Sequence, residues 1–258
     1  VLGLTPGGSP VGIYSELVEM FRAGEASFRN VVVFSLDEFY GISKEAQQSR
    51  NFRIHEEFLE YVNVRPEDTF IPDPSVPVEK VSQYCRDYEA KIAEMGGLDL
   101  MLLGMGSKGQ IGFNEAGSYS NSKTRMVALS NASIKEEASA FAGAENVPTK
   151  AITMGIGTIL SAKEIVLVAW GEDKASVVGQ VIEGVIDPMC PATYLQEHHN
   201  IEIVIDEEAA EELTRVKAPW LVGTCNWSPK FIRKAVIWLA MKTQKPILKL
   251  TYDDYIDN

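Results

Sequence analysis

The sequence is poor in cysteine and histidine, the residues that most often build metal centres and disulfide frameworks. Its 258 residues include three cysteines and three histidines. The cysteines Cys85, Cys190 and Cys225 lie far apart without C-x-x-C spacing, and two of the histidines, His198 and His199, are adjacent. We interpret the cysteines as reduced, mostly buried thiols of a cytoplasmic protein. Since no group of residues has the spacing of metal ligands, we expect neither a metal nor a cofactor.

Basic charge and long apolar runs are also scarce. The 24 Lys and Arg are outnumbered by 36 Asp and Glu, which gives a net charge of -12. Nucleic acid and anionic membrane surfaces need a basic partner, so the composition argues against both. No apolar run approaches the length that crosses a bilayer. A small anionic ligand remains compatible, because a few backbone amides and one lysine can bind it locally.

The chain begins directly in an apolar run, Val1 to Leu4, that predicts a buried strand. It has no initiator Met, signal peptide or leading helix before this strand. We therefore expect the chain to be N-terminally truncated or part of a longer polypeptide.

Apolar strand patterns alternate with helical patterns along the whole chain. Strands are predicted at 1–4, 31–36, 98–103, 165–170 and 201–205, with further edge strands at 125–129 and 247–250. Helices are predicted at about 47–62, 78–95, 134–141, from near 174, and 229–242. This alternation predicts an α/β fold, a Rossmann-like, mostly parallel sheet with helices on both faces.

The loop after strand 98–103 is the first candidate ligand site. Four glycines fall within nine residues from Gly104, and Asn114 and Glu115 close the loop. Glycines let a backbone approach a ligand closely, and loops at the carboxyl ends of parallel strands bind ligands in open α/β sheets. We expect Gly104, Gly106 and Asn114 to contact the ligand.

Part of this loop matches the dinucleotide-binding pattern G-x-G-x-x-G, at residues 104–109. That fingerprint needs a helix directly after the glycines and an acid at the end of the next strand. Here Gly112 and Gly117 follow, which disfavours a helix, and the candidate strand 125–129 ends in Ser130. The sequence therefore argues against a dinucleotide site.

Three further features lie at strand ends, and each has two interpretations. The turn Gly7-Gly8-Ser9 before a helix is an anion-binding arrangement or a tight turn that relieves strain. The acids Asp37 and Glu38 are a helix cap or include a functional carboxylate. Lys174, at a strand-to-helix turn, neutralises a phosphate or is solvated.

The order of these motifs resembles the glucosamine-6-phosphate deaminase/isomerase family, which is related to the 6-phosphogluconolactonases. The resemblance covers essentially the whole chain, which lacks the N-terminal segment of the family, so we expect 1–258 to form a single domain of this kind. It is carried by the following collinear motifs: Leu4-Thr5-Pro6-Gly7-Gly8-Ser9-Pro10, Leu36-Asp37-Glu38-Phe39, Gly104-x-Gly106-x-x-Gly109-x-Ile111-x-Phe113-Asn114-Glu115, Thr153-Met154-Gly155-Ile156-Gly157-Thr158, Gly171-x-x-Lys174 and Leu195-Gln196.

The resemblance implies a sugar phosphate as the ligand, held at its phosphate by Gly7, Gly8, Ser9 and Lys174. It implies that Asp37 is the base that moves a proton between C1 and C2 of the sugar. Family members often form oligomers, so a homo-oligomer is compatible with the resemblance.

Ring opening is the step at which this chain departs from the family. The resemblance assigns Glu115 to the ring-opening group, but Lys108 and Gln110 occupy the positions where the family has Asp and His. Glutamine has no titratable proton, so Gln110 can hold a hydroxyl but cannot relay its proton. Lys108 could act as a base only if its pKa fell far below about 10.4. A phosphate-binding arginine of the family aligns with Ser139.

Two functions follow from these observations. The first is an enzyme that converts an amino-sugar phosphate to a ketose phosphate and ammonia, with a non-standard ring-opening relay at Lys108 and Gln110. The second is a catalytically impaired sugar-phosphate-binding or regulatory module. A phosphogluconolactonase-type hydrolase is a third, weaker alternative, since that family also usually has a histidine in the central loop.

Overall fold

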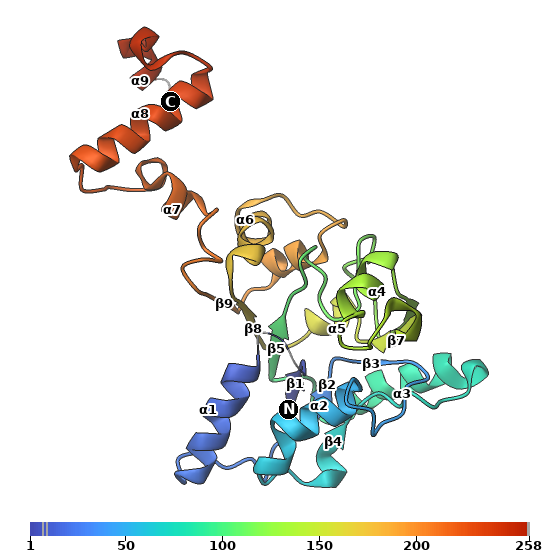
Figure 1. The fold of residues 1–258 in the computed structure, drawn as a ribbon. Coiled ribbons are helices and arrows are strands. Elements are labelled where there is room, and N and C mark those ends of the chain that lie inside the picture. The colour runs from blue at the N-terminus through green and yellow to red at the C-terminus, as the bar shows by residue number, and fades with distance from the viewer. Residues whose placement is uncertain (7, 9, 257–258) are drawn as a thin grey trace.

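Six parallel strands form the central sheet of the protein (Figure 1). A computed structural model describes residues 1–6, 8 and 10–256. From one edge to the other, the strands of the sheet are β4 (Thr69–Phe70), β2 (Val33–Ser35), β1 (Leu2–Leu4), β5 (Leu100–Gly104), β8 (Glu164–Ala169) and β9 (Ile201–Ile205). Every neighbouring pair is parallel. The predicted parallel sheet is confirmed, although β9 lies at an edge rather than in the centre and so exposes alternate side chains.

Both faces of this sheet carry a buried apolar core, because successive side chains of a strand point to opposite faces. Val33, Leu102 and Val168 join one core, which the following helices cover: α1 (Val11–Arg22) and α2 (Arg50–Glu57). Phe34 joins the core on the other face, which the following helices cover: α3 (Val81–Glu94), α5 (Ile156–Ile159) and α6 (Ala175–Glu183). The expected helices on both faces are therefore confirmed.

A second, antiparallel sheet lies beside the first. Its strands are β3 (Asp37–Phe39), β7 (Lys150–Thr153) and β6 (Arg125–Ala128), with β7 in the centre. β6 confirms the edge strand predicted at 125–129, whereas β7 is a strand that was not predicted from the sequence. The chain passes from the parallel sheet to this one at Leu36, so Asp37 stands at the junction.

Several predicted elements are shorter or differ in kind. The helix predicted at 47–62 is divided at Phe58, and that predicted at 134–141 is α4 (Asn131–Glu137). The strand predicted at 247–250 is wrong: after Pro246 the chain forms a single 3-10 turn. The 3-10 segments are η1 (Leu59–Tyr61), η2 (Pro66–Asp68), η3 (Val78–Lys80), η4 (Ala144–Asn146), η5 (Glu172–Lys174), η6 (Pro191–Glu197), η7 (Pro219–Leu221) and η8 (Ile247–Lys249).

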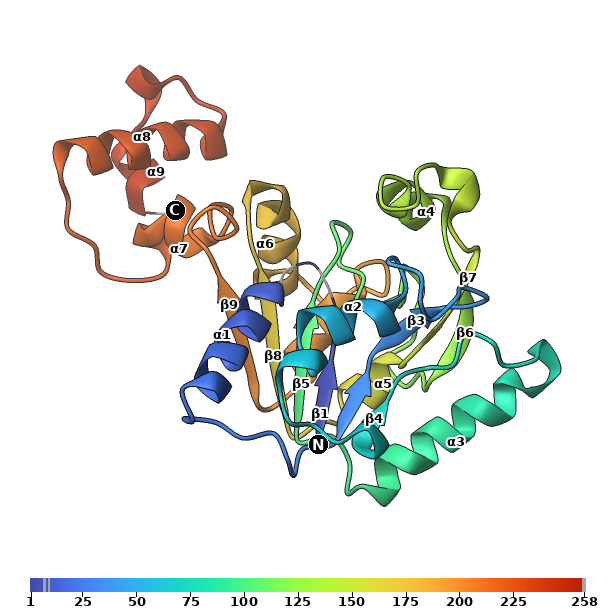
Figure 2. The ribbon, with the colours of Figure 1, turned by 60° about the horizontal axis from the view of Figure 1, so that its bottom comes forward.

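The C-terminal helices stand away from the α/β body, as Figures 1 and 2 show. They are α8 (Pro229–Thr243), which confirms the predicted helix, and α9 (Tyr252–Ile256). The short helix α7 (Thr214–Lys217) precedes them and stays against the body, where the amide and hydroxyl of Thr214 donate to Glu183 at the end of α6. Trp220 packs edge-on against Phe231 and Trp238, so this part has its own aromatic cluster. Among the helices of the described residues, none is both long and apolar enough to span a bilayer.

We predict that Phe34→Ala lowers the free energy of unfolding by about 3–5 kcal/mol. The Phe34 ring is fully buried, with its centroid 4.8 Å from that of Phe70 and 5.6 Å from that of Tyr88, so truncation leaves a cavity. Urea unfolding measures the loss. The control is Val204→Ala on the edge strand, where Val204 is 37% exposed and the expected loss is below about 1 kcal/mol. Equal losses at the two positions would contradict the assignment of the core.

Candidate active site

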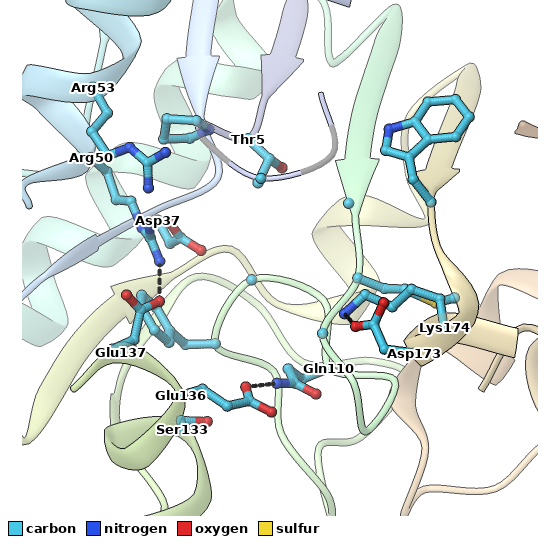
Figure 3. Close-up of a pocket in the computed structure, with 18 residues that line it drawn as sticks. Thr5, Asp37, Arg50, Arg53, Gln110, Ser133, Glu136, Glu137, Asp173 and Lys174 are labelled. Atoms are coloured by element: carbon cyan, nitrogen blue, oxygen red, sulfur yellow. Dashed lines mark hydrogen bonds and ion pairs between the residues drawn. The ribbon is translucent and has the colours of Figure 1, made fainter. Parts of the chain in front are cut away.

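A polar cavity of about 490 Å³ lies at the carboxyl edge of the parallel sheet (Figure 3). Strands β1, β2, β5 and β8 all end at this edge, because they run parallel. The cavity is lined by Thr5, Pro6, Gly8, Asp37, Arg50, Arg53, Gly104, Met105, Gly106, Gln110, Gly112, Phe113, Ser133, Glu136, Glu137, Trp170, Asp173 and Lys174. It therefore joins residues that are up to 169 positions apart, from Thr5 to Lys174.

The adjacent acids Asp37 and Glu38 have different surroundings. The Glu38 carboxylate is completely buried and accepts hydrogen bonds from the Ser49 hydroxyl and the backbone amides of Phe39, Arg50 and Asn51. It therefore caps the first turn of α2. Asp37 lines the cavity instead. Of the two interpretations of this pair, the cap is correct for Glu38, and the functional role of Asp37 stays a prediction.

The Asp37 carboxylate is buried beside a buried arginine. Its Oδ1 lies 3.4 Å from Nε of Arg50, whose Nη2 donates to Glu137 at 3.0 Å. The pKa of Asp37 is raised to about 6 as the net result of burial, which raises it most, of the Arg50 cation, which lowers it, and of the Glu38 and Glu137 carboxylates, which raise it. Asp37 is thus ionised at neutral pH but is a stronger base than an ordinary aspartate.

The Arg50 guanidinium has a fixed place in the wall of the cavity. It lies over the aromatic rings of Phe39 and Phe113, with its carbon 4.9 and 5.5 Å from their centroids. Burial lowers the pKa of Arg50, but the carboxylates of Asp37 and Glu137 raise it by more, so the side chain stays cationic. Arg50 therefore places a fixed positive charge beside the Asp37 carboxylate.

The central glycine-rich loop forms another wall. The Gly106 amide donates to the Gln110 carbonyl, and a Cβ built on Gly106 would lie 2.1 Å from the Gln110 side chain. A side chain at position 106 would therefore displace the Gln110 carboxamide from this position. Gly104 and Gly106 line the cavity as predicted, whereas Asn114 does not. Asn114 is buried and donates to the carbonyls of Ile111 and Met154, so it shapes the loop instead.

The residues predicted to share the ring-opening role lie in different places. Gln110 lines the cavity, donates from Nε2 to Glu136 at 2.8 Å, and accepts from the Lys108 amide. The Lys108 side chain is exposed and does not line the cavity. Glu115 accepts from the Ser130 amide at 3.0 Å and lines a neighbouring hollow. Their catalytic roles stay predictions, but only Gln110 shares the cavity with Asp37.

Lys174, one of the predicted phosphate ligands, lies on the opposite side of the cavity from Asp37 in the view of Figure 3. Lys174, at the end of η5, has 17% of its side chain exposed, and its Nζ lies 3.5 Å from an Asp173 oxygen. Gly8 lines the cavity with a φ of 64°, a conformation that favours glycine. Gly7 and Ser9 lie outside the described residues, so their predicted roles are untested.

Nine lining residues with polar or aromatic side chains were not predicted from the sequence as site residues: Thr5, Arg50, Arg53, Phe113, Ser133, Glu136, Glu137, Trp170 and Asp173. Arg50 and Arg53 are three positions apart on a helix, which places them on one face, but the sequence does not indicate what that face meets. Ser139, which aligns with a family arginine, is exposed and does not line the cavity. Within 1–6, 8 and 10–256, no group of three or more His, Cys, Asp or Glu is arranged to hold a metal.

Fold and cavity together define a Rossmann-like α/β protein with a polar, ligand-sized cavity at the carboxyl edge of its sheet. The family model of glucosamine-6-phosphate isomerases/6-phosphogluconolactonase matches residues 1–204. The chain belongs to this family.

Relatives agree with this assignment. A glucosamine-6-phosphate deaminase of Thermoanaerobacter sp. (strain X514) is 42% identical over 210 residues, which cover 81% of this chain and 82% of that protein. A Bacteroides thetaiotaomicron protein described as glucosamine-6-phosphate deaminase-like is 45% identical over all 258 residues. Because the match covers 39% of that relative, the present chain spans about two fifths of its length.

Solved structures share the fold. The structure of a monomeric glucosamine-6-phosphate deaminase superimposes with a TM-score of 0.78 at 37% identity, covering 82% of this chain and 87% of that one. A 6-phosphogluconolactonase of Thermotoga maritima has a TM-score of 0.61 at 20% identity, covering 80% and 84%. The second likeness concerns the fold alone.

We predict that Asp37→Asn removes a pH dependence of stability. The native pKa of Asp37, about 6, lies above its ordinary value of 3.8, so the folded protein binds more protons than the unfolded chain in this window. Stability from the neutral carboxyl is present below pH 4 and is lost as the pH rises through 6. The variant should gain about 3 kcal/mol relative to the wild type between pH 4 and pH 7.

Urea unfolding at a series of pH values measures this difference between the two proteins. Asp87→Asn, which replaces an exposed aspartate, is the control and should show a constant difference across the range. A constant difference for Asp37→Asn as well would show that Asp37 titrates normally.

Proposed function

We propose that this chain is a sugar-phosphate isomerase and deaminase that converts an amino-sugar phosphate to a ketose phosphate and ammonia. The observation that carries the proposal is Asp37, a buried carboxylate at the wall of a polar cavity, whose pKa is raised to about 6. Membership of the family supports it, as do the deaminases among the relatives.

In this proposal Asp37 is the base that moves a proton between C1 and C2. Isomerisation removes a proton from a carbon next to a carbonyl, which needs a carboxylate within hydrogen-bond reach and a pKa near the working pH. Asp37 is rigid, since it lies in β3 and its Oδ1 faces Arg50. The Arg50 cation beside it lowers the pKa of this carboxyl and so favours its ionised form at neutral pH.

The phosphate group is assigned to the end of the cavity that holds Lys174. Its ammonium group would pair with phosphate oxygens, and the loop that contains Gly7, Gly8 and Ser9 would supply backbone amides and a hydroxyl. The Lys174 side chain points into the cavity beside Asp173 (Figure 3). With the phosphate here, the sugar carbons extend towards Asp37.

One observation favours the alternative, a sugar-phosphate-binding module without turnover. Gln110 lies in the cavity where a titratable group is expected, and its amide cannot relay a proton. A binding module needs the phosphate end of the cavity but no base at Asp37. The two functions therefore differ in what Asp37→Asn changes.

We predict that Asp37→Asn lowers kcat for glucosamine 6-phosphate by about 10²- to 10⁴-fold, because the amide cannot accept a proton. Release of ammonia and fructose 6-phosphate measures turnover. The wild-type rate should fall as the pH drops through about 6, since Asp37 must be ionised to act as the base. A wild type that binds the sugar phosphate without forming product would establish the binding module instead.

We also predict that Lys174→Met raises KM for the same substrate by about 10- to 100-fold, because it removes one charge-assisted hydrogen bond to the phosphate. The effect on kcat should be smaller than the effect on KM. Lys135→Met is the matched control, since Lys135 is exposed and does not line the cavity. An unchanged KM in the Lys174 variant would place the phosphate elsewhere.

A further inference from the structure

Glu136 is a carboxylate in the cavity wall that the proposed chemistry has not yet used. It comes from α4, and its two oxygens accept from two different residues of the central loop. Gln110 Nε2 donates to Oε2 at 2.8 Å, and the Ser107 hydroxyl donates to Oε1. In the view of Figure 3, Glu136 and Gln110 lie between the Asp37 side and the Lys174 side of the cavity.

The partners of Glu136 distinguish it from the other lining acids. Glu137 pairs with Arg50 at 3.0 Å, Asp173 lies beside Lys174, and Asp37 lies beside Arg50. By contrast, the hydrogen bonds that the described residues give to Glu136 come from a neutral amide and a neutral hydroxyl. No cation of the described residues forms an ion pair with this carboxylate, so a ligand need not displace one to reach it. Its exposure to the cavity also lets it reach a ligand.

A cyclic sugar must open before Asp37 can act, because the ring form has no carbonyl next to the carbon that loses its proton. Opening removes the proton from the hydroxyl on C1 and adds one to the ring oxygen. One carboxylate that faces both oxygens can do this, as base and then as acid.

We propose that Glu136 is the acid–base group that opens the sugar ring, which makes it a catalytic residue of the proposed reaction and rests on that function. The Glu136 carboxylate takes the proton from O1, and the O1 electron pair forms the C1–O1 double bond. The bond between C1 and the ring oxygen breaks, and its electron pair stays on the ring oxygen. The carboxyl group then gives its proton to that oxygen, so no proton is gained or lost overall.

Gln110 and Ser107 position this carboxylate. Each donates to one oxygen, which fixes the side chain and leaves the second lone pair of each oxygen for the ligand. The Gln110 carboxamide is fixed in turn by the Lys108 amide, which donates to its Oε1 at 3.0 Å. The neutral amide of Gln110 thus serves to hold the Glu136 carboxylate in place.

The first test is the Glu136→Gln variant, assayed for product from glucosamine 6-phosphate. We expect kcat to fall by about 10²- to 10⁴-fold, as on loss of a general acid–base group. Binding of the open-chain alcohol 2-amino-2-deoxyglucitol 6-phosphate, measured by calorimetry, should stay within about threefold of the wild type, because this ligand has no ring to open. Turnover within threefold of the wild type, or loss of this binding, would overturn the role of Glu136. The matched control is Glu145→Gln, which replaces an exposed glutamate outside the cavity.

The second test separates ring opening from proton transfer at carbon. The Asp37→Asn protein, which leaves the substrate intact, is mixed with glucosamine 6-phosphate, and exchange between its two anomers is followed by NMR. We expect Asp37→Asn to accelerate the exchange and Asp37→Asn/Glu136→Gln not to do so. Equal acceleration by both, or by neither, would overturn the proposal for Glu136. If instead wild type and Asp37→Asn alike form no product while exchange still depends on Glu136, the proposed function fails and the ring-opening role stands.

Discussion

The buried Glu38 carboxylate fixes the geometry on which the cavity depends. It takes hydrogen bonds from the first amides of α2 and from Ser49, in a helix whose first turn contains no acid of its own. This joins α2 to β3 and sets the start of the helix at Arg50, whose guanidinium then meets Asp37. The same negative charge raises the pKa of the neighbouring Asp37. The two adjacent acids thus have different roles: Glu38 is the structural cap, and Asp37 is the proposed base.

The two cations Arg50 and Lys174 of the cavity are paired differently, and this difference favours one orientation of the ligand. Arg50 is buried between Asp37 and Glu137, so a ligand could bind this cation only by breaking a desolvated ion pair. Among the described residues, the ion-pair partner of Lys174 is Asp173, which is largely exposed and 3.5 Å away, and such a contact contributes little. A phosphate can therefore bind Lys174 with little loss of free energy from the Asp173 contact, while Arg50 stays paired with Asp37. This asymmetry supports a substrate oriented with its phosphate at η5 and its reacting carbons at β3.

Much of the fold could be predicted from the sequence because its strands are continuous apolar runs. The runs 31–36 and 98–103 pack into the cores on both faces of the sheet, and such continuous apolar runs are typical of parallel strands. Because the strands are parallel, their carboxyl ends lie at one edge of the sheet. β7 was missed because its four residues lead straight into glycines, and only pairing with β3 and β6 makes them a strand. The places of Asp37 and Lys174 at strand ends made them candidates with two interpretations each, and the family resemblance assigned them to the site. Arg50 was not predicted, because its contact with Asp37 depends on how α2 is capped.

The central loop shows why a substitution cannot be judged from its own position. Taken alone, Gln110 is the loss of a titratable side chain. In the folded chain its amide reaches Glu136, 26 positions later, which arrives from α4 after the chain has passed through β6 of the second sheet. That sheet had not been predicted in full, so nothing in the sequence brought the two together. If Glu136 moves the proton, the chain keeps a titratable group for ring opening, not at position 110 itself but at a residue that is hydrogen-bonded to Gln110. Gln110 and Glu136 then form one functional unit, which substitution at either position would disrupt.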